Sequence, residues 1–213
     1  MPPYALAIFD FDGTLADSWR LMGQAIVEAA DRFGYRRLSP DEVQHLRGQD
    51  NRAVMQALGV KLWQLPGIAV HMRQVALDKA DHIALFPGVH EMLVALARAG
   101  VRIAVVSSNG EEAIRRVLGG ELSRVVHDYD CGAAIFGKAA KFRRVVRRAD
   151  VAPAEAIAIG DEARDIDAAT AAGVASGAVT WGYATPGLLE SRAPTHIFRS
   201  IDEVTSALTG VQG

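Results

Sequence analysis

Short runs of apolar residues recur along this chain, each bounded by polar or turn-forming residues. Their length and composition are typical of buried strands. Seven runs are candidates: residues 5–9, 101–106, 124–126, 133–136, 156–159, 177–181 and 196–198. The candidates at 124–126 and 133–136 are the weakest of the set. The chain from residue 84 onward is therefore expected to contribute most of a sheet that also includes residues 5–9.

Between these runs, apolar residues recur every three or four positions, which predicts helices. One helix is expected to end at Gly100 and another at Gly173, with two more at 111–118 and 138–149. Strands that alternate with helices of this length indicate right-handed crossovers and a parallel sheet covered on both faces. The predicted fold class is α/β, with a doubly wound, mostly parallel, Rossmann-like sheet. In such sheets the chemistry gathers at the carboxyl ends of the strands.

Residues 16–83 show a helical pattern and no strand-like run. Ser39 and Glu42 match a capping box at the start of one helix. Four helices are expected there, at about 19–33, 40–47, 51–58 and 66–83. The pattern predicts an all-helical domain, residues 16–83, inserted into an α/β core domain made of residues 1–15 and 84–213.

Composition and charge narrow the possible partners. The formal net charge of −2 gives no global field that would attract nucleic acid or an anionic membrane. No apolar run approaches the ~18 residues of a membrane span, and the start of the chain does not match a signal peptide, so a cytoplasmic location is expected. The single Cys131 excludes an internal disulfide, and the histidines lack zinc-ligand spacing. The one basic cluster is interpreted as a solvated helix face: Lys138, Lys141, Arg143, Arg144, Arg147 and Arg148.

The first strand ends in two acids, Asp10 and Asp12, which project to the same side because side chains in an extended segment alternate. Adjacent carboxylates raise each other's pKa unless a cation holds them, and oxygen ligands suit a hard ion such as Mg²⁺. The alternative is a hairpin turn at Asp12 and Gly13. That alternative is disfavoured because residues 21–33 have a helical period instead of forming a return strand.

Polar groups follow three of the predicted strands. Asp10 and Asp12 follow the first, residues 107–109 follow another, and Asp161 begins an acidic run after the strand at 156–159. Each group alone could merely cap the next helix, but a parallel sheet brings all three to one edge. With a lysine from a neighbouring helix, the set suits phosphoryl transfer. A carboxylate that attacks a phosphate dianion meets about 8 kcal/mol of repulsion at ~4 Å and an effective dielectric of ~20, which a divalent ion and an ammonium can offset.

Four motifs, in order, resemble those of the haloacid dehalogenase superfamily: Asp10-Phe-Asp-Gly-Thr, Val106-Ser-Ser-Asn, Lys138 and Gly160-Asp-Glu-Ala-Arg-Asp. The helical insert is similar in place and length to the cap of the phosphoglycolate phosphatase-like branch. The resemblance implies a magnesium-dependent phosphatase whose cap closes over a small phosphorylated metabolite and which acts through an aspartyl phosphate. The expected assembly is a monomer or a homodimer.

The resemblance also implies roles for individual residues. Asp10 would be the nucleophile and a metal ligand, and Asp12 the general acid/base and a ligand through its backbone carbonyl. Asp161 would bind the metal directly, with Glu162 and Asp165 as supporting or water-mediated ligands. The phosphate and substrate would contact Gly13, Thr14, Ser107, Ser108, Asn109 and, from the cap, Arg47. For Arg47 the alternative is a solvated arginine at the end of its helix.

Several alternatives stay open at this point. Lys138 is favoured as the lysine of the site, with Lys141 the alternative on the same helix face. Glu162 stands where a serine is frequent, so the ligand set could differ. The second acid, Asp12, favours a phosphatase over haloacid hydrolysis. The other functional alternatives are a phosphosugar mutase of the same fold and a catalytically silent, magnesium-binding scaffold for a partner protein.

Overall fold

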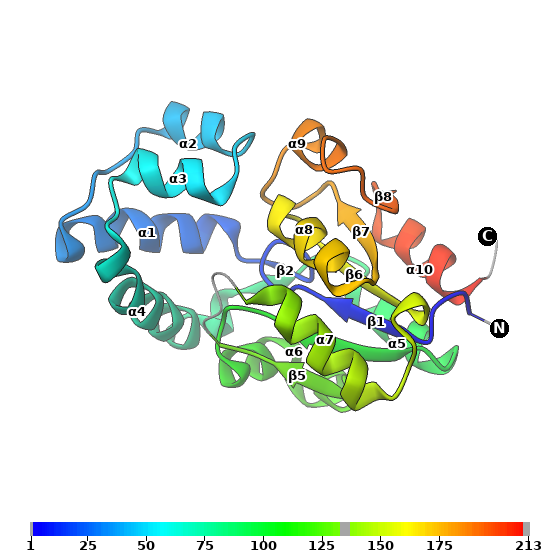
Figure 1. Ribbon diagram of the computed structural model, residues 1–213. Coiled ribbons are helices and arrows are strands. Elements are labelled where there is room, and N and C mark those ends of the chain that lie inside the picture. Colours follow the sequence, from blue (N-terminus) through cyan, green and yellow to red (C-terminus); the bar gives the residue numbers. More distant parts are fainter. Residues whose placement is uncertain (1, 133–136, 211–213) are drawn as a thin grey trace.

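The protein is built around one six-stranded sheet, in the order β5-β4-β1-β6-β7-β8, whose strand pairs are all parallel (Figure 1). The computed structural model describes residues 2–132 and 137–210. The strands are β1 (Leu6–Phe9), β4 (Arg102–Val106), β5 (Asp128–Asp130), β6 (Ala156–Gly160), β7 (Ala175–Val179) and β8 (His196–Phe198). Because the connections run outward in both directions from β1, the strand order reverses beside β1, where ligand crevices form in such sheets.

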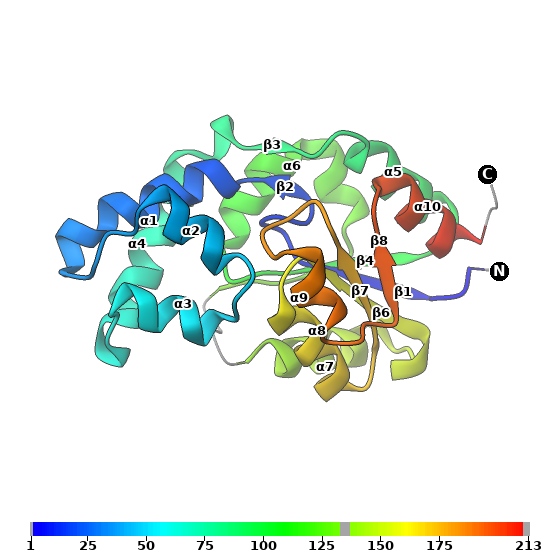
Figure 2. The same ribbon diagram turned by 90° about the horizontal axis from the view of Figure 1, so that it is seen from above.

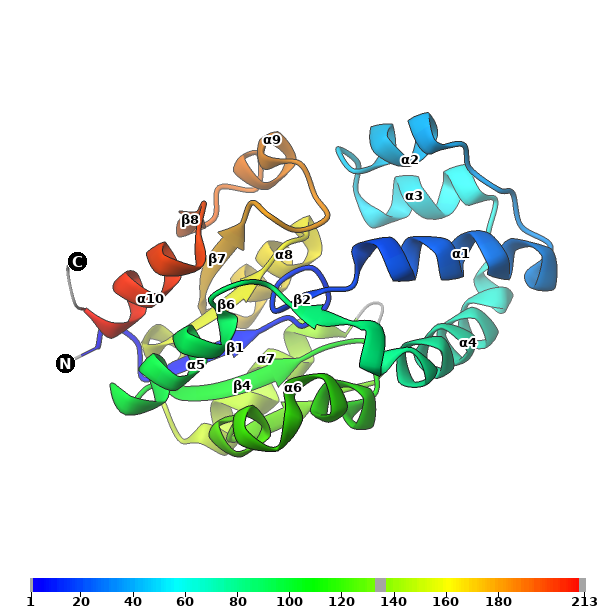
Figure 3. The same cartoon turned by 180° about the vertical axis from the view of Figure 1, so that it is seen from behind.

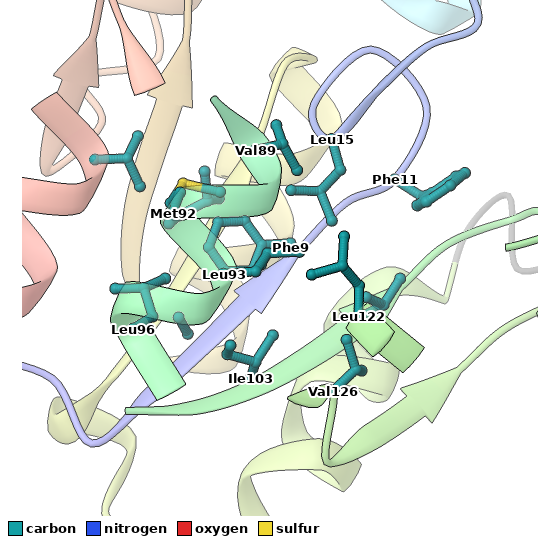
Figure 4. Close-up of a cluster of buried hydrophobic side chains, with 14 of the residues drawn as sticks. Phe9, Phe11, Leu15, Val89, Met92, Leu93, Leu96, Ile103, Leu122 and Val126 are labelled. Carbon is teal, nitrogen blue, oxygen red and sulfur yellow. The ribbon is translucent and has the colours of Figure 1, made fainter. Parts of the chain in front are cut away.

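Helices cover both faces of the sheet, as the alternation along β1 requires. Ala7 and Phe9 face one layer, made by α5 (Val89–Arg98), α6 (Glu111–Val125) and α10 (Ile201–Thr209). Figure 4 shows the α5 side chains Val89, Met92, Leu93 and Leu96 packed toward Phe9 and Ile103. Leu6 and Ile8 face the other layer, made by α7 (Lys138–Ala149) and α8 (Ala163–Ala172). The short α9 (Pro186–Glu190) precedes β8. The predicted doubly wound α/β fold is confirmed.

A helical segment, residues 19–78, lies beside the carboxyl ends of the strands (Figures 1 and 3). It contains α1 (Trp19–Phe33), α2 (Pro40–Leu46), α3 (Asn51–Leu58), the 3₁₀ turn η1 (Leu62–Gln64) and α4 (Leu65–Asp78). It has its own small hydrophobic cluster around Ala29, Ala30, Tyr35 and Leu58. The predicted capping box is confirmed, because Glu42 N–H donates to Ser39 Oγ and Ser39 N–H donates to Glu42 Oε2.

The chain enters and leaves the helical segment through two connections, and each connection contains a short strand. The two strands pair with each other as a small ribbon. β2 (Ala16–Asp17) is antiparallel to β3 (Ala84–Leu85), which follows the 3₁₀ turn η2 (Ala80–His82). The prediction that residues 16–83 contain no strand is therefore wrong at its first two residues. Two residues are too few to show an alternating pattern. The division into a core domain and a cap domain stays a prediction.

The structure corrects the sheet assignment in the middle of the chain. The predicted strand at 124–126 is wrong, because α6 continues to Val125 after a bend at Gly119. The strand in this region is β5, which is polar and pairs with β4 at the edge of the sheet. The predicted strand at 133–136 lies outside the described residues.

Among the described residues, no single helix is long and apolar enough to cross a membrane. One pair of helices, Arg52–Leu58 and Leu62–Asp78, has the required length and composition when taken together, but the pair is bent by 96°.

Candidate active site

Three aspartates meet at the carboxyl edge of the sheet. Asp10 follows β1, Asp161 follows β6, and Asp165 lies in the first turn of α8. One carboxylate oxygen from each lies within 4.8 Å of the others, and the residues are only 4%, 1% and 2% exposed. Oxygen donors at this spacing fit a hard divalent cation. The predicted convergence of Asp10 and Asp161 is thus observed, with Asp165 beside them.

Lys138, the first residue of α7, is inserted into this cluster. Its Nζ lies 2.8 Å from Asp10 Oδ2 and 2.5 Å from Asp165 Oδ1, and its side chain is only 12% exposed. Burial alone would lower the pKa of Lys138, but the two facing carboxylates outweigh it and raise the pKa. The ammonium therefore stays protonated between the two acids.

Burial also changes the proton affinity of the acids. It raises the pKa of Asp10, an effect that Lys138 opposes and Asp165 reinforces. It raises the pKa of Asp161 well above its ordinary value, and the charges of Glu162 and Asp10 raise it further. Lys138 and Arg164 supply two positive charges, which do not balance the four neighbouring carboxylates of Asp10, Asp161, Glu162 and Asp165. The donor set therefore favours a bound cation, which would allow these groups to ionise.

Asp12 lies outside the three-aspartate cluster and is held by two donors. Ser18 Oγ donates to Asp12 Oδ1 at 2.8 Å, and Asn109 Nδ2 donates to Asp12 Oδ2 at 3.4 Å. Burial raises the pKa of Asp12, so this carboxyl keeps its proton to a higher pH than an exposed aspartate does. Ser18 was not among the residues predicted from the sequence.

The segment after β4 presents the predicted hydroxyl and amide groups. Ser107 is buried, and its Oγ accepts from Asn109 N–H at 3.0 Å. Asn109 is also buried, and its side-chain oxygen accepts from Gly110 N–H at 2.8 Å. Ser108 is exposed. The structure thus brings Ser107 and Asn109 to the edge of the site and turns Ser108 toward solvent.

Lys141 is not in contact with the three aspartates. Its Nζ donates to the backbone carbonyls of Ser107 (2.9 Å), Asp130 (3.0 Å) and Gly132 (2.7 Å). Burial lowers the pKa of Lys141. Of the two lysines left open by the sequence, the structure places Lys138 beside Asp10 and Lys141 beneath the Ser107 segment. Both turn inward, so the interpretation of the whole basic cluster as a solvated face is wrong for these two residues.

Glu162 and Arg164 form an ion pair next to the aspartates. Arg164 Nη2 lies 2.5 Å from Glu162 Oε1, and the two side chains are 33% and 16% exposed. The carboxylate of Glu162, followed by Asp165, raises the pKa of Arg164. Glu162 is not one of the three clustered acids. Its partner in the structure is the guanidinium of Arg164. Arg164 lies within the fourth motif, but the sequence assigned it no role.

The 181–185 loop, which follows β7, is a part of the site that the sequence analysis missed. Tyr183 N–H donates to Asp161 Oδ2 at 2.7 Å, and Trp181 Nε1 donates to the Thr14 carbonyl at 3.1 Å. Thr14 Oγ1 in turn donates to Asp161 Oδ1 at 2.9 Å. From the helical segment, Arg47 reaches this loop. The sequence could have indicated this loop as part of the site, because the parallel strand β7 ends at the same edge of the sheet as β1 and β6.

Gly13 allows the chain to turn tightly around Asp161. Its φ is +75°, and a Cβ at this position would lie 2.2 Å from Asp161 Oδ2. Gly13→Ala is therefore expected to displace the Asp161 carboxylate and lower activity by roughly tenfold or more. Gly59→Ala is the matched control, because Gly59 has a φ of +67° with nothing within 4 Å of such a Cβ. If both variants lose activity to a comparable extent, the loss in Gly13→Ala comes from backbone strain and not from displacement of the Asp161 carboxylate.

Comparison with known proteins places this geometry in a family. A model of the family described as haloacid dehalogenase-like hydrolase matches residues 7–179, which contain all the strand-end acids. The chain belongs to the haloacid dehalogenase-like hydrolase family. The family resemblance predicted from the four motifs is confirmed. The 181–185 loop, which lies entirely after the family match, completes the site in this chain.

Curated proteins similar to this chain carry more specific names. The phosphoglycolate phosphatase of Synechococcus elongatus is 29% identical over 203 residues, which cover 95% of this chain and 96% of that protein. The tyrosine-protein kinase PtkA of Mycobacterium bovis is 27% identical over 209 residues, covering 95% of this chain and 72% of that protein. The predicted similarity to the phosphoglycolate phosphatase-like branch is thus confirmed, with a kinase also among the relatives.

Solved structures share the fold. A haloacid dehalogenase-like family protein from Streptococcus pneumoniae superimposes with a TM-score of 0.77 at 21% identity, covering 96% of this chain and 98% of that one. CbbY from Rhodobacter sphaeroides, solved in complex with phosphate, gives a TM-score of 0.75 at 20% identity and covers 94% and 96% of the two chains. These likenesses confirm the Rossmann-like α/β architecture.

Proposed function

We propose that this protein is a magnesium-dependent phosphatase that hydrolyses a small phosphomonoester. The observation that carries the proposal is the position of Lys138 Nζ, between Asp10 and Asp165 and next to a triad of acids that fits a divalent cation. The relatives named phosphoglycolate phosphatase support a small phosphorylated acid as the substrate. This arrangement supplies the charge neutralisation and positioning on which phosphoryl transfer depends.

Each residue of the site would have a defined task. Asp10 attacks phosphorus, the bond from phosphorus to the ester oxygen breaks, and Asp12 gives its proton to the departing alcohol. Asp12 then takes a proton from water, which attacks the aspartyl phosphate and releases inorganic phosphate. Lys138 offsets the negative charge that builds up beside Asp10, and Ser107 donates to a phosphate oxygen. Mg²⁺ held by Asp10, Asp161 and Asp165 would supply the remaining positive charge.

The experiment that tests the proposal measures inorganic phosphate released from 2-phosphoglycolate and from p-nitrophenyl phosphate, with Mg²⁺ and with EDTA. Phosphate release that requires Mg²⁺ is the expected result. A mutase would return an isomer without free phosphate, and haloacid hydrolysis would release halide without Mg²⁺. Tyrosine phosphorylation from ATP would indicate the activity named for the PtkA relative. Absence of turnover across a panel of phosphorylated metabolites would favour the silent scaffold.

The proposed cation predicts a pH dependence of stability. Burial raises the pKa of Asp10 and of Asp161, so the stability that their protonated forms contribute is present below the unfolded value of ~3.9 and is lost as the pH rises through the folded values. Mg²⁺ is therefore expected to raise the melting temperature more at pH 8 than at pH 5. At a Mg²⁺ concentration a hundredfold above Kd, binding raises the free energy of unfolding by about 2.7 kcal/mol. This corresponds to a rise in melting temperature of roughly 5–10 °C.

Differential scanning fluorimetry at the two pH values measures this effect, with Asp161→Asn as the control variant. The amide removes one anionic ligand, so Mg²⁺ is expected to shift the melting temperature of Asp161→Asn much less than that of the wild type. Equal Mg²⁺ shifts at pH 5 and pH 8, or an undiminished shift in the variant, would contradict the assignment of these acids to the cation.

A further inference from the structure

Arg47 follows α2 in the helical segment and is bound along one side of the 181–185 loop. Its Nε donates to the Tyr183 carbonyl at 2.7 Å, and its Nη2 donates to the Gly182 carbonyl at 3.0 Å. Its own carbonyl accepts from Thr185 N–H at 3.1 Å. The side chain thus uses the paired donors of a guanidinium on two consecutive carbonyls of the loop, a geometry that lysine cannot reproduce.

The opposite side of the same loop is bonded to Asp161. Tyr183 N–H donates to Asp161 Oδ2 at 2.7 Å, and Ala184 N–H donates to the Asp161 carbonyl at 3.3 Å. At Gly182 the contact is so close that an added Cβ would lie 2.2 Å from the Asp161 Cβ. A shift of the loop would therefore change the position of Asp161 directly.

Aromatic contacts strengthen the connection between the helical segment and the loop. The Arg47 guanidinium lies 5.5 Å from the centroid of the Trp19 ring, at the start of α1. The Trp19 ring also contacts the Tyr183 ring, with 5.0 Å between centroids. Figure 2 shows the end of α2 beside the connection between β7 and α9, which the hydrogen bonds of Arg47 join. Two points of the helical segment, 28 positions apart in sequence (47 − 19), thus hold the same loop.

We infer that Arg47 is a positioning residue for the cation site: it acts from the helical segment, through the 181–185 loop, on Asp161. The inference rests on the proposed function in one respect, namely that Asp161 binds the divalent ion. It replaces direct substrate binding as the role of Arg47, because Nε and Nη2 of its guanidinium are bound to two backbone carbonyls of the loop. Cation affinity is then linked to the docking of the helical segment against the loop.

The test uses the full-length protein without substrate and compares wild type, Arg47→Met and Arg47→Lys. Arg52→Met is the matched control, because Arg52 is an exposed arginine of the same helical segment. Calorimetric titration with Mg²⁺ or Mn²⁺ gives the Kd, and hydrogen–deuterium exchange reports the protection of the Tyr183 and Ala184 amides. Arg47→Met is expected to raise the Kd for the ion roughly tenfold, as changes to groups that orient a ligand do. Arg47→Lys, which keeps the charge without the paired geometry, is expected to show most of this loss.

The outcomes separate the inference from the proposed function. Faster exchange at the loop with weaker ion binding in both Arg47 variants, and neither change in Arg52→Met, supports the inference. An ion Kd within twofold of wild type together with a raised KM for the phosphate ester would overturn it in favour of direct substrate binding. Unchanged loop exchange would overturn it as well. If wild type binds no ion while the Arg47 variants still expose the loop, the coupling to Asp161 stands and the proposed cation is wrong.

Discussion

Asp10→Asn is expected to abolish phosphate release, with a loss of at least about 10⁴-fold, as removal of an attacking nucleophile causes in other enzymes. The amide has nearly the same volume as the carboxylate, but its oxygen is a poor nucleophile and it carries no charge for a cation or for Lys138. The Asp10 carboxylate accepts from Phe11 N–H at 2.8 Å and lies 2.8 Å from Lys138 Nζ. Steady-state release of inorganic phosphate with saturating Mg²⁺ measures the effect.

Asp17→Asn is the matched control for this substitution, because Asp17 is an exposed aspartate only seven positions away (17 − 10). Its rate is expected to equal that of wild type within about twofold. Acid-quenched wild type should retain covalently bound phosphate, whereas Asp10→Asn should retain none. If both variants hydrolyse the ester at the wild-type rate, Asp10 is not the nucleophile and the proposed chemistry is wrong.

The central strands were predictable because they are buried on both faces. β1 and β6 are continuous apolar runs, as is β4 after its exposed first residue, Arg102, and their parallel order follows from the helices between them. β5 escaped prediction because it is the edge strand Asp128-Tyr129-Asp130. Its acids pair with Arg148 and Arg144 on α7 and are not buried in a core. A strand held by charge pairs gives no apolar pattern in the sequence.

The basic cluster illustrates a second limit of the sequence. Lys138, Lys141 and Val145 lie on one face of α7 at spacings of three and four, so the two lysines share the buried side of the helix. An isolated helical pattern cannot distinguish a lysine that neutralises buried acids from one that is solvated. The distinction depends on what the rest of the fold places opposite each ammonium.

Acids and hydroxyls at the strand ends could be predicted because topology alone brings them together. The contacts that orient them could not, since they join distant positions. Asn109 and Asp12 are 97 residues apart, and Arg47 and Tyr183 are 136 apart. No local pattern encodes these pairs. They follow only from the register of the sheet and the docking of the helical segment.

Lys138→Met is expected to have the second-largest effect, on both activity and stability. It leaves the buried carboxylates of Asp10 and Asp165 without the ammonium that contacts both. Loss of one partner from a buried ion pair costs about 3–5 kcal/mol, and loss of a positive donor at the reacting group lowers turnover by roughly 10²- to 10³-fold. Urea denaturation and phosphate release measure the two effects, with Lys79→Met, an exposed lysine, as the matched control.

The stability loss of Lys138→Met is expected to depend on pH and on Mg²⁺. Lys138 opposes the rise in the pKa of Asp10, so this pKa is expected to rise further without the ammonium, and the stability penalty is expected to be smaller at pH 5 than at pH 8. A bound divalent ion is expected to offset part of the stability loss at pH 8. Removal of the ion with EDTA is expected to bring the full stability loss back. Lys141→Met separates the two lysines, because it removes the donor to the Ser107 carbonyl and leaves the ammonium beside Asp10 in place. Greater loss of turnover in Lys141→Met than in Lys138→Met would reverse their roles.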